Sequence, residues 1–222
     1  MIEVILDTET TGLSVAEGHR IVEIGCIEIK DLIPTKNKFH CYLNPERKVS
    51  KEAFQVHGYS DEFLSKQKKF SEVVDEFLNF IKGKKLVIHN AEFDISHINN
   101  ELKLIGKNII KEEIVDTLQI ARDKFPGSGT SLDALCKRYN IDNSRREKHT
   151  AVLDCDLLLK VYINLLEQRE PTFELNVDKE INPEDQSNTF IKYSKKVIKP
   201  TDEEIKLHKD YLKKQIKKNY FN

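Results

Sequence analysis

The order in which strand-like and helix-like segments follow one another limits the folds open to this chain. Segments of strand character come first, at 3–9 (EVILDTE), 19–30 (HRIVEIGCIEIK) and 38–45 (KFHCYLNP), with short turns between them. Three such strands predict an antiparallel meander. Further short strands, at 85–90 (KLVIHN) and from residue 114, then alternate with helical segments. This order predicts an α/β fold with a mixed central sheet, an antiparallel meander plus parallel strands, flanked by helices.

Apolar residues recur at helical spacing in the segments that follow the meander. The first helix is expected to run from Ser60, a suitable N-cap, to Gly83, which ends the pattern. Other helices are expected at 131–141 and 149–168, and after the strand that begins at residue 114. In the helix at 91–106, five apolar residues are expected to face inward: Phe93, Ile95, Ile98, Leu102 and Ile105.

The composition limits which kinds of partner and which cellular location are expected for this protein. The 222 residues have a formal net charge of −1, so any contact with nucleic acid must be a local patch. The four cysteines show no C-x-x-C pairing, which argues against structural zinc and for a reducing compartment. No apolar run approaches the length of a membrane span, and the chain enters a strand at once. We therefore expect no signal peptide, no membrane contact and a cytoplasmic location.

The composition changes after about residue 168. The stretch ELNVDKEINPEDQSN is polar and acidic and nearly devoid of core residues, which predicts a flexible linker. A short helix is predicted where TDEEIKLHKDYL begins, with Thr201 as its N-cap. We therefore expect three parts: a folded domain at 1–167, a linker at 168–198 and a tail at 199–222.

Two acids, Asp7 and Glu9, stand at the end of the first strand. Side chains at i and i+2 of a strand point to the same face, so these carboxylates project together. Like charges that close are unfavourable unless a cation joins them. By itself, the pair fits either a strand that has ended in a polar turn or half of a site for a hard cation such as Mg²⁺ or Mn²⁺.

Three further candidates lie later in the chain. Asp94 follows the strand at 85–90, and Asp154 falls among apolar residues, where a buried carboxylate needs a cation. His149 stands five residues before Asp154 and should lie in the loop or frayed first turn. Taken singly, Asp94 equally fits an N-cap or a salt bridge, and His149 an ordinary surface histidine.

Taken together, these residues carry a resemblance. Asp7 and Glu9, Asn90-x-x-Phe93-Asp94 and His149-x-Ala151-x-x-Asp154 occur in this order and resemble the three motifs of the DEDDh family of 3′→5′ exonucleases. Within residues 1–167, DTETTG, VHGYSDEFL, LVIHNAEFD, FPG…SLDALCKRYNID and HTAVLD are similar in particular to the epsilon (proofreading) subunits of bacterial DNA polymerase III. TDEEIKLHKDYL is similar to the tails of those subunits. The resemblance implies a ribonuclease H-like exonuclease fold.

The resemblance also implies a chemistry. Two divalent metal ions, Mg²⁺ or Mn²⁺, would assist hydrolysis of the phosphodiester at a mispaired 3′ end and release nucleoside 5′-monophosphates. The resemblance implies that His149 is the proton acceptor and that Asp7 is the ligand shared by both metal ions. It assigns metal binding to four acids: Asp7, Glu9, Asp94 (directly or through water) and Asp154.

The terminal nucleotide would be contacted by a set that overlaps these acids: Asp7, Glu9, Glu52, His57 and Asp154. Glu52 and His57, in SKEAFQVHG, match family positions, and His57 precedes a helix N-terminus, a suitable place to meet a phosphate. Both residues also fit a plain surface loop. Five further polar residues are expected to have local structural roles: His89 and Asn90 in the loop around Asp94, Asp116 and Asp133 as helix-start or capping acids, and Asp156 as a solvated neighbour of Asp154.

The partners implied are a DNA 3′ end, the polymerase III catalytic (alpha) subunit through the tail, and the sliding clamp through Gln168–Phe173. The clamp peptide QREPTF departs from the usual pattern at Pro171, and the end of a helix broken by proline is the alternative. Two other functions remain open. One is a free-standing DEDDh nuclease that trims RNA or short oligonucleotides, and the other is an inactive scaffold between polymerase and clamp.

Overall fold

The computed structural model describes residues 2–144, 146, 148–166 and 200–215. It divides into two units, each described here by itself. The predicted borders at 167/168 and 198/199 and the peptide Gln168–Phe173 lie outside the described residues, so the domain limits stay predictions.

A five-stranded mixed sheet forms the centre of the first unit, in the order β3-β2-β1-β4-β5. The meander consists of β1 (Ile2–Thr10), β2 (Ile21–Lys30) and β3 (Ile33–Tyr42), paired antiparallel. The short strands β4 (Lys85–Ile88) and β5 (Ile114–Asp116) add in parallel beside β1. The predicted α/β sheet is confirmed.

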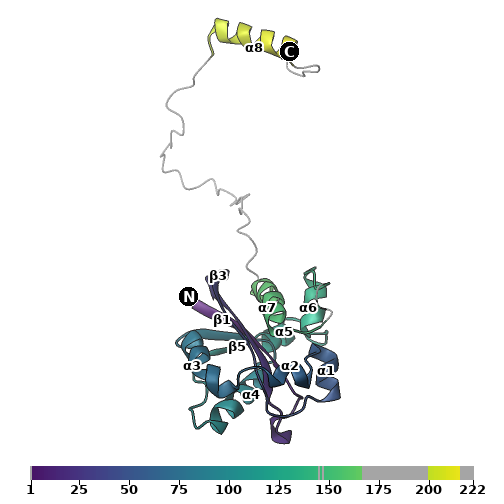
Figure 1. Cartoon of the computed structure of the whole chain (residues 1–222). Coiled ribbons are helices and arrows are strands. Elements are labelled where there is room, and N and C mark those ends of the chain that lie inside the picture. Colours follow the sequence, from purple (N-terminus) through teal and green to yellow (C-terminus); the bar gives the residue numbers. More distant parts are fainter. Residues whose placement is uncertain (1, 145, 147, 167–199, 216–222) are drawn as a thin grey trace, which may run out of the picture. The chain divides into compact units, whose positions relative to one another are not determined.

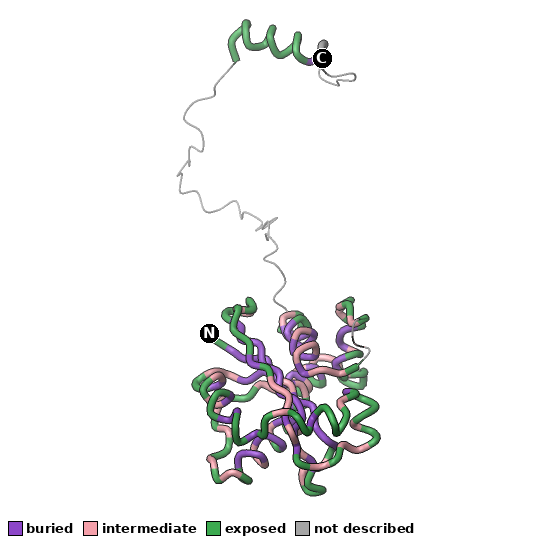
Figure 2. Tube along the Cα trace, viewed as in Figure 1, coloured by how far each residue is buried: buried purple, intermediate pink, exposed green. Residues whose placement is uncertain are grey.

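Helices cover both faces of the sheet (Figure 1). On one face, α3 (Phe70–Ile81) and α4 (Ala91–Leu104) bury Val4, Leu6 and Ile24. On the other, α5 (Thr117–Lys124), α6 (Leu132–Arg138) and α7 (Ala151–Leu165) pack on Ile5, Ile27 and Val87. Figure 2 shows the strands as the buried centre of the domain. Alternate residues of β1 thus enter separate cores, as the period of two in a strand requires.

The helix expected at 60–83 is wrong as a single element. Two helices stand there, α2 (Asp61–Ser65) and α3, each with its own start. Ser60 caps α2 as predicted, by accepting from the N–H of Phe63. At the start of α3, the backbone N–H of Lys69 donates to Glu72 Oε2 at 2.7 Å. This second start interrupts the helix although the segment QKK contains neither glycine nor proline.

The helix α1 (Lys51–His57) was not predicted, and it replaces the alternative of a surface loop for Glu52 and His57. Ser50 caps it by accepting from the N–H of Ala53. It ends at Gly58, whose φ of 78° is a left-handed conformation that glycine adopts without strain.

The buried face of α4 differs in part from the prediction. Ile98 and Leu102 are fully buried, but Phe93, Ile95 and Ile105 are only half-buried. Three polar residues of α4 are buried instead, and their burial is possible because each makes a hydrogen bond. Asp94 bonds Thr8, His97 bonds the carbonyl of Phe93, and Glu101 bonds Arg20.

A close approach between α7 and the sheet positions the candidate site. Gly25 in β2 lies directly opposite Asp7, and a Cβ at residue 25 would stand 2.6 Å from the backbone carbon of Ala151. No side chain larger than hydrogen fits there unless the backbone moves. The first turn of α7 is therefore as close to β1 and β2 as a helix can pack.

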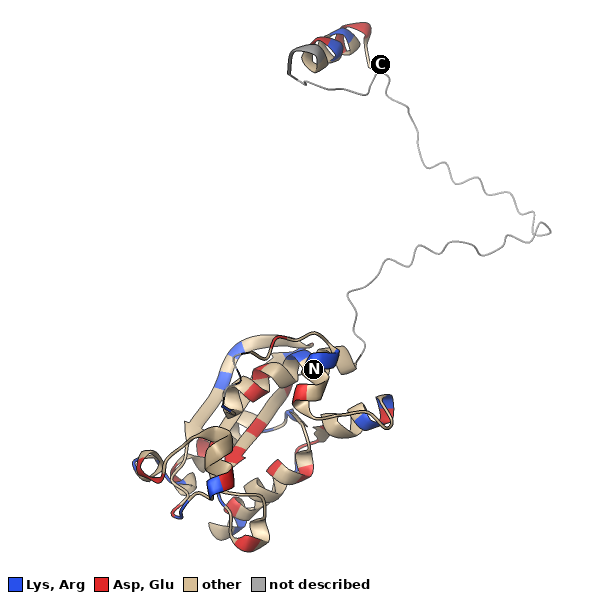
Figure 3. Cartoon of the chain, turned by 90° about the vertical axis from the view of Figure 1, so that its right-hand side faces the viewer, with Lys and Arg blue, Asp and Glu red and all other residues tan. Residues whose placement is uncertain are grey.

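The second unit contains α8 (Asp202–Gln215), as predicted from Thr201 onward. Thr201 Oγ1 accepts from the N–H of Glu204, and the N–H of Thr201 donates to Glu204 Oε2 at 2.8 Å, which makes a capping box. Three acids stand in its first turn and lysines predominate after them (Figure 3), and most of the helix is exposed (Figure 2). Of its apolar residues, Leu212 is 9% exposed, Ile205 38% and Tyr211 59%.

Candidate active site

The strand β1 changes character at Asp7. Its face toward α7 carries Glu3 and Ile5 and then two acids in succession, Asp7 and Glu9. The strand extends through both acids to Thr10, and the chain bends only after it, at residues 11–13. Among the described residues, no donor makes a hydrogen bond to the carboxylate of Asp7 or Glu9.

A third carboxylate, Asp94, reaches β1 from the first turn of α4. Its Oδ1 accepts from the backbone N–H of Thr8 at 2.9 Å and from the Thr8 hydroxyl at 2.7 Å. Asp94 is 3% exposed. Because Thr8 lies between Asp7 and Glu9 in the strand, these two bonds hold Asp94 beside the acidic pair.

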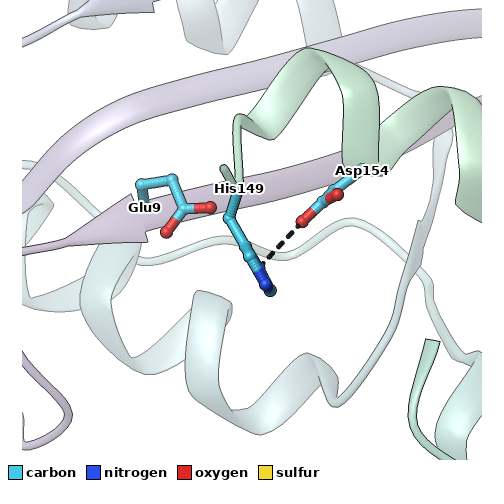
Figure 4. Close-up of side chains that lie close together, drawn as sticks. All are labelled: Glu9, His149 and Asp154. Carbon is cyan, nitrogen blue, oxygen red and sulfur yellow. Dashed lines mark ion pairs between the residues drawn. The ribbon is translucent and has the colours of Figure 1, made fainter. Parts of the chain in front are cut away.

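The start of α7 supplies the remaining two candidates. Thr150 caps the helix, His149 stands in the loop just before it, and Asp154 lies in the first turn. The N–H of His149 donates to the carbonyl of Val56 in α1 at 3.1 Å, which fixes the loop. One ligand atom each of Glu9, His149 and Asp154 lies within 4.8 Å of the others (Figure 4).

A cation that the sequence analysis did not single out, Arg146, enters this cluster. It donates to both carboxylate oxygens of Asp154, from Nε at 2.6 Å and from a terminal nitrogen at 2.7 Å. It also contacts Asp133 Oδ1 at 2.7 Å. The same terminal nitrogen lies 2.9 Å from His149 Nδ1. A guanidinium can only donate, so Nδ1 accepts, and a neutral ring carries its hydrogen on Nε2.

Burial and mutual repulsion raise the pKa values of three of the acids. The pKa of Asp7 lies well above its usual range, because of burial first and then the charges of Asp94 and Glu9. Burial and the charge of Asp154 raise the pKa of Glu9 to about 8. Burial raises the pKa of Asp94 to about 7 although Thr8 stabilises its charged form.

Asp154 is the exception among the acids. Burial raises the pKa of Asp154, but the ring of His149, whose Nδ1 lies 3.4 Å from Oδ2, and the two hydrogen bonds from Arg146 outweigh burial and hold the value below the usual range. The site thus contains an ionised acid with a cationic partner, beside acids that the fold brings together without one. An all-oxygen donor set of this kind fits divalent hard cations.

We expect Arg146→Met to lower the Tm of the metal-free protein. Arg146 and Asp154 have side chains only 8% and 4% exposed, and removing one partner of a buried pair costs about 3 kcal/mol. Added Mn²⁺ should raise the Tm of the variant more than that of the wild type, because the ion no longer competes with the guanidinium for Asp154. Differential scanning calorimetry with and without Mn²⁺ measures both effects.

Arg20→Met is the matched control. Arg20 makes an equally short bidentate pair with Glu101, with two bonds of 2.6 Å, away from the acid cluster. This variant should have a lower Tm than the wild type, but added Mn²⁺ should raise its Tm by as much as it raises that of the wild type. Equal Mn²⁺ shifts in both variants would show that Arg146 does not compete with the metal.

We expect the Tm of the metal-free protein to fall as the pH rises from about 6.5 to about 8, above the range in which the buried neutral His57, with its pKa lowered to about 4, acts in the opposite direction. In this window Glu9 and Asp94 are ionised in the unfolded chain, whereas the folded protein keeps their protons until its raised pKa values of about 8 and about 7. The lowered pKa of Asp154 acts only below its usual value of 3.8, outside this window. Thermal unfolding in EDTA across this range, with Glu9→Gln for comparison, tests the assignment. If the Tm of Glu9→Gln fell as steeply with pH as that of the wild type, the assignment would be wrong.

A cavity of about 570 Å³ opens beside the acids, between β1 and α1. Glu9, Glu52, His57 and Phe93 line it, so the structure places Glu52 and His57 next to the acid cluster as expected. Nδ1 of His57 accepts from the N–H of Tyr59 at 3.0 Å, and burial lowers the pKa of His57 to about 4. The ring is therefore neutral with its hydrogen on Nε2. This nitrogen is buried and makes no hydrogen bond among the described residues, and the backbone of Thr10 is the polar group that acts on the ring.

The remaining polar residues have the structural roles that were expected. Asp116 caps α5, by accepting from the N–H of Leu118, and also accepts from the N–H of Asn90 at 3.0 Å. His89 Nδ1 bonds Thr117 Oγ1 at 2.9 Å. Asp133 lies in the first turn of α6, and Asp156 pairs with Lys160 at the surface.

The sequence is similar to those of DNA polymerase III epsilon subunits over nearly its whole length. The family model described as Exonuclease (RNase_T) matches residues 4–162. The DNA polymerase III subunit epsilon of Rickettsia conorii is 47% identical over 98% of this chain and 98% of its own length. The subunit of the same name from Escherichia coli is 48% identical over 72% of this chain and 70% of its own length.

Solved structures share the fold. The nuclease domain of 3′hExo, a DEDDh family member bound to rAMP, is 16% identical with a TM-score of 0.65, over 75% of this chain and 92% of that one. Exonuclease X in complex with 5′ overhanging duplex DNA is 24% identical with a TM-score of 0.59, over 76% of this chain and 93% of that one. At these identities the likeness shows the ribonuclease H-like exonuclease architecture alone.

None of the helices within the described residues is long and apolar enough to cross a membrane. The fold is thus that of the DEDDh nucleases, the acids of three elements converge beside a cavity, and the match to polymerase III epsilon subunits extends over nearly the full length. The chain belongs to the exonuclease family, among the epsilon subunits of DNA polymerase III.

Proposed function

We propose that this chain is the proofreading 3′→5′ exonuclease of a DNA polymerase III and that Asp7, Glu9, Asp94, His149 and Asp154 form its active site. The convergence of four acids from β1, α4 and α7 on one point carries this proposal, because such a cluster is repulsive until cations join it. The similarity to epsilon subunits over nearly their whole length supports the replicative role over a free-standing or inactive protein.

Divalent metal ions are typical of the family, and we propose Mg²⁺ or Mn²⁺ as the ions in this site. When bound, two such ions would activate the attacking water and stabilise the leaving 3′ oxygen. Asp7, Glu9, Asp94 and Asp154 would hold them. Asp7 is central among these acids, because the charges of Asp94, Glu9 and Asp154 all raise its pKa, after burial.

The other residues would bind the substrate and move the proton. His149 would accept a proton from the attacking water, and the product would be a nucleoside 5′-monophosphate. For that role Arg146 has to release Nδ1 or the ring has to carry its hydrogen there, because the present contact leaves the hydrogen on Nε2. His57 and Glu52, which line the cavity, would contact the terminal nucleotide there, Glu52 from the first turn of α1.

A degradation assay tests the function directly. The purified chain is given a primer with a mismatched 3′ end, the matched primer, and a single-stranded RNA, each with Mg²⁺ or Mn²⁺. Release of 5′-dNMP from the 3′ end, faster from the mismatched primer than from the matched primer or the RNA, is the expected result. Faster degradation of RNA would identify a ribonuclease and reject the proofreading role.

For the partners beyond DNA, we propose the alpha subunit for the tail 199–222 and the sliding clamp for Gln168–Phe173. The replicative setting of the relatives also supports a cytoplasmic location. In α8, Ile205, His208 and Leu212 lie at helical spacing and form an apolar stripe suited to a groove of a partner. A short helix of this kind is not stable alone and should be stabilised by docking.

Deletion of residues 199–222 is expected to abolish co-purification with the alpha subunit and to leave digestion of single-stranded DNA unchanged. Leu212→Asp should do the same, because it places a charge in the stripe while every lysine remains. Lys206→Asp is the matched control on another face and should keep co-purification. If the deletion weakens DNA binding while the polymerase still co-purifies, the lysines bind DNA and the docking proposal is wrong.

A further inference from the structure

A fifth carboxylate, Glu23, lies behind the acid cluster. Glu23 stands on β2 directly opposite Glu9, so the two side chains share a face of the sheet. Its side chain is completely buried. A buried carboxylate beside four others is costly unless donors satisfy it.

Donors from three separate segments satisfy Glu23. His40 Nε2 on β3 lies 2.7 Å from Oε1. The hydroxyl of Tyr59, in the loop after α1, donates to Oε2 at 2.7 Å. The backbone N–H of Ala151, the first residue of α7, donates to the same oxygen at 2.9 Å.

Two of these donors belong to segments that carry candidate site residues. Ala151 lies between His149 and Asp154 in the chain, so its N–H fixes the turn that presents both. Tyr59 stacks on His57 with ring centroids 4.7 Å apart, and its N–H bonds His57 Nδ1 at 3.0 Å. One buried side chain thus connects the general base, a metal-ligand candidate and the cavity histidine to the sheet.

We infer that Glu23 is a positioning residue, which sets the place of Asp154 and His149 through Ala151 and the orientation of His57 through Tyr59. The inference rests on the catalytic roles proposed above. Gly25 allows the first turn of α7 to approach the sheet, and Glu23 fixes its position there. Partners behind metal ligands commonly change metal affinity or activity by about 10- to 100-fold when they are replaced.

Two substitutions distinguish the effect of the length of the Glu23 side chain from the effect of its charge. Glu23→Gln keeps an oxygen that can accept from Tyr59 and Ala151 but loses the charge. Glu23→Asp keeps the charge but draws it back by one methylene. Glu3→Asp is the matched control, because Glu3 is also a buried carboxylate bound to α7, through the Tyr162 hydroxyl at 3.1 Å at the far end of that helix.

The measurements are kcat and KM on single-stranded DNA with saturating Mn²⁺, and the Mn²⁺ affinity by titration calorimetry. All are made below the Tm of every variant. Glu23→Asp is expected to lower kcat and Mn²⁺ affinity by about tenfold or more with KM for DNA nearly unchanged. Glu23→Gln should stay within about threefold of wild type, and Glu3→Asp should lose stability only.

If Glu23→Asp kept its kcat and Glu23→Gln lost it, the charge of Glu23 would be what matters. That result would contradict the positioning role. Equal losses of kcat in Glu23→Asp and Glu3→Asp would also overturn it, since any weakened contact with α7 would then suffice. If wild type lacks exonuclease activity, the proposed function fails, and the Mn²⁺ affinities of the three variants still decide the positioning role.

Discussion

Replacement of Asp7 by alanine or asparagine is expected to abolish metal-dependent 3′→5′ digestion of DNA, to below about one per cent of wild type. Asp7 occupies the centre of the acid cluster, and its pKa shows the repulsion of Asp94, Glu9 and Asp154 added to burial. The assay is release of 5′-dNMP from a labelled single-stranded substrate with Mg²⁺ and with Mn²⁺.

The stability of this variant is part of the same prediction. Asp7 accepts no hydrogen bond from the described residues, so without metal its loss removes repulsion and no attraction. The Tm in EDTA should be unchanged or higher. Asp154→Ala should abolish activity equally but lower the Tm in EDTA, because it removes two bonds to Arg146. Activity of Asp7→Asn well above one per cent would argue against a mechanism with two metal ions.

Replacement of His149 by alanine is expected to lower kcat by roughly two to four orders of magnitude. The loop is held by the backbone bond from His149 to Val56, which the substitution leaves in place. DNA affinity should therefore change little, and the loss should lie in the chemical step. Single-turnover rates, together with DNA binding measured in Ca²⁺, separate the two.

The pH dependence gives an independent check on the role of His149. If His149 is the proton acceptor, the pH profile of kcat should differ between the wild type and the alanine variant. If the variant keeps the wild-type pH dependence at a lower rate, the proton acceptor is another group.

Local patterns predicted much of this site, and tertiary contacts supplied what they left out. The period of two in β1 predicted that Asp7 and Glu9 would share a face, and the five-residue separation predicted that His149 would precede the helix of Asp154. The convergence of Asp94 with them followed only from the resemblance, because it depends on the bonds from Thr8, 86 residues away in sequence.

Arg146 and Glu23 could not be found by pattern. Arg146 is one of two adjacent arginines in a polar segment, and only the folded loop brings it to Asp154. Glu23 is an ordinary polar residue in a strand until the register places it opposite Glu9. The helix α1 was missed because seven residues give too short a window for periodicity, although Ser50 was a usable start signal.

The packing at Gly25 has a consequence for how loss of replication fidelity would be traced in genetics. Asp7 belongs to the sheet and Asp154 to α7, and the gap between them is set by a residue that contributes no side chain. Any substitution at position 25 would move these two acids apart while leaving every acid and histidine of the site intact. In a screen for strains with raised mutation frequency, changes at this codon should therefore appear alongside those at the metal-binding codons. A survey confined to chemically reactive residues would overlook them.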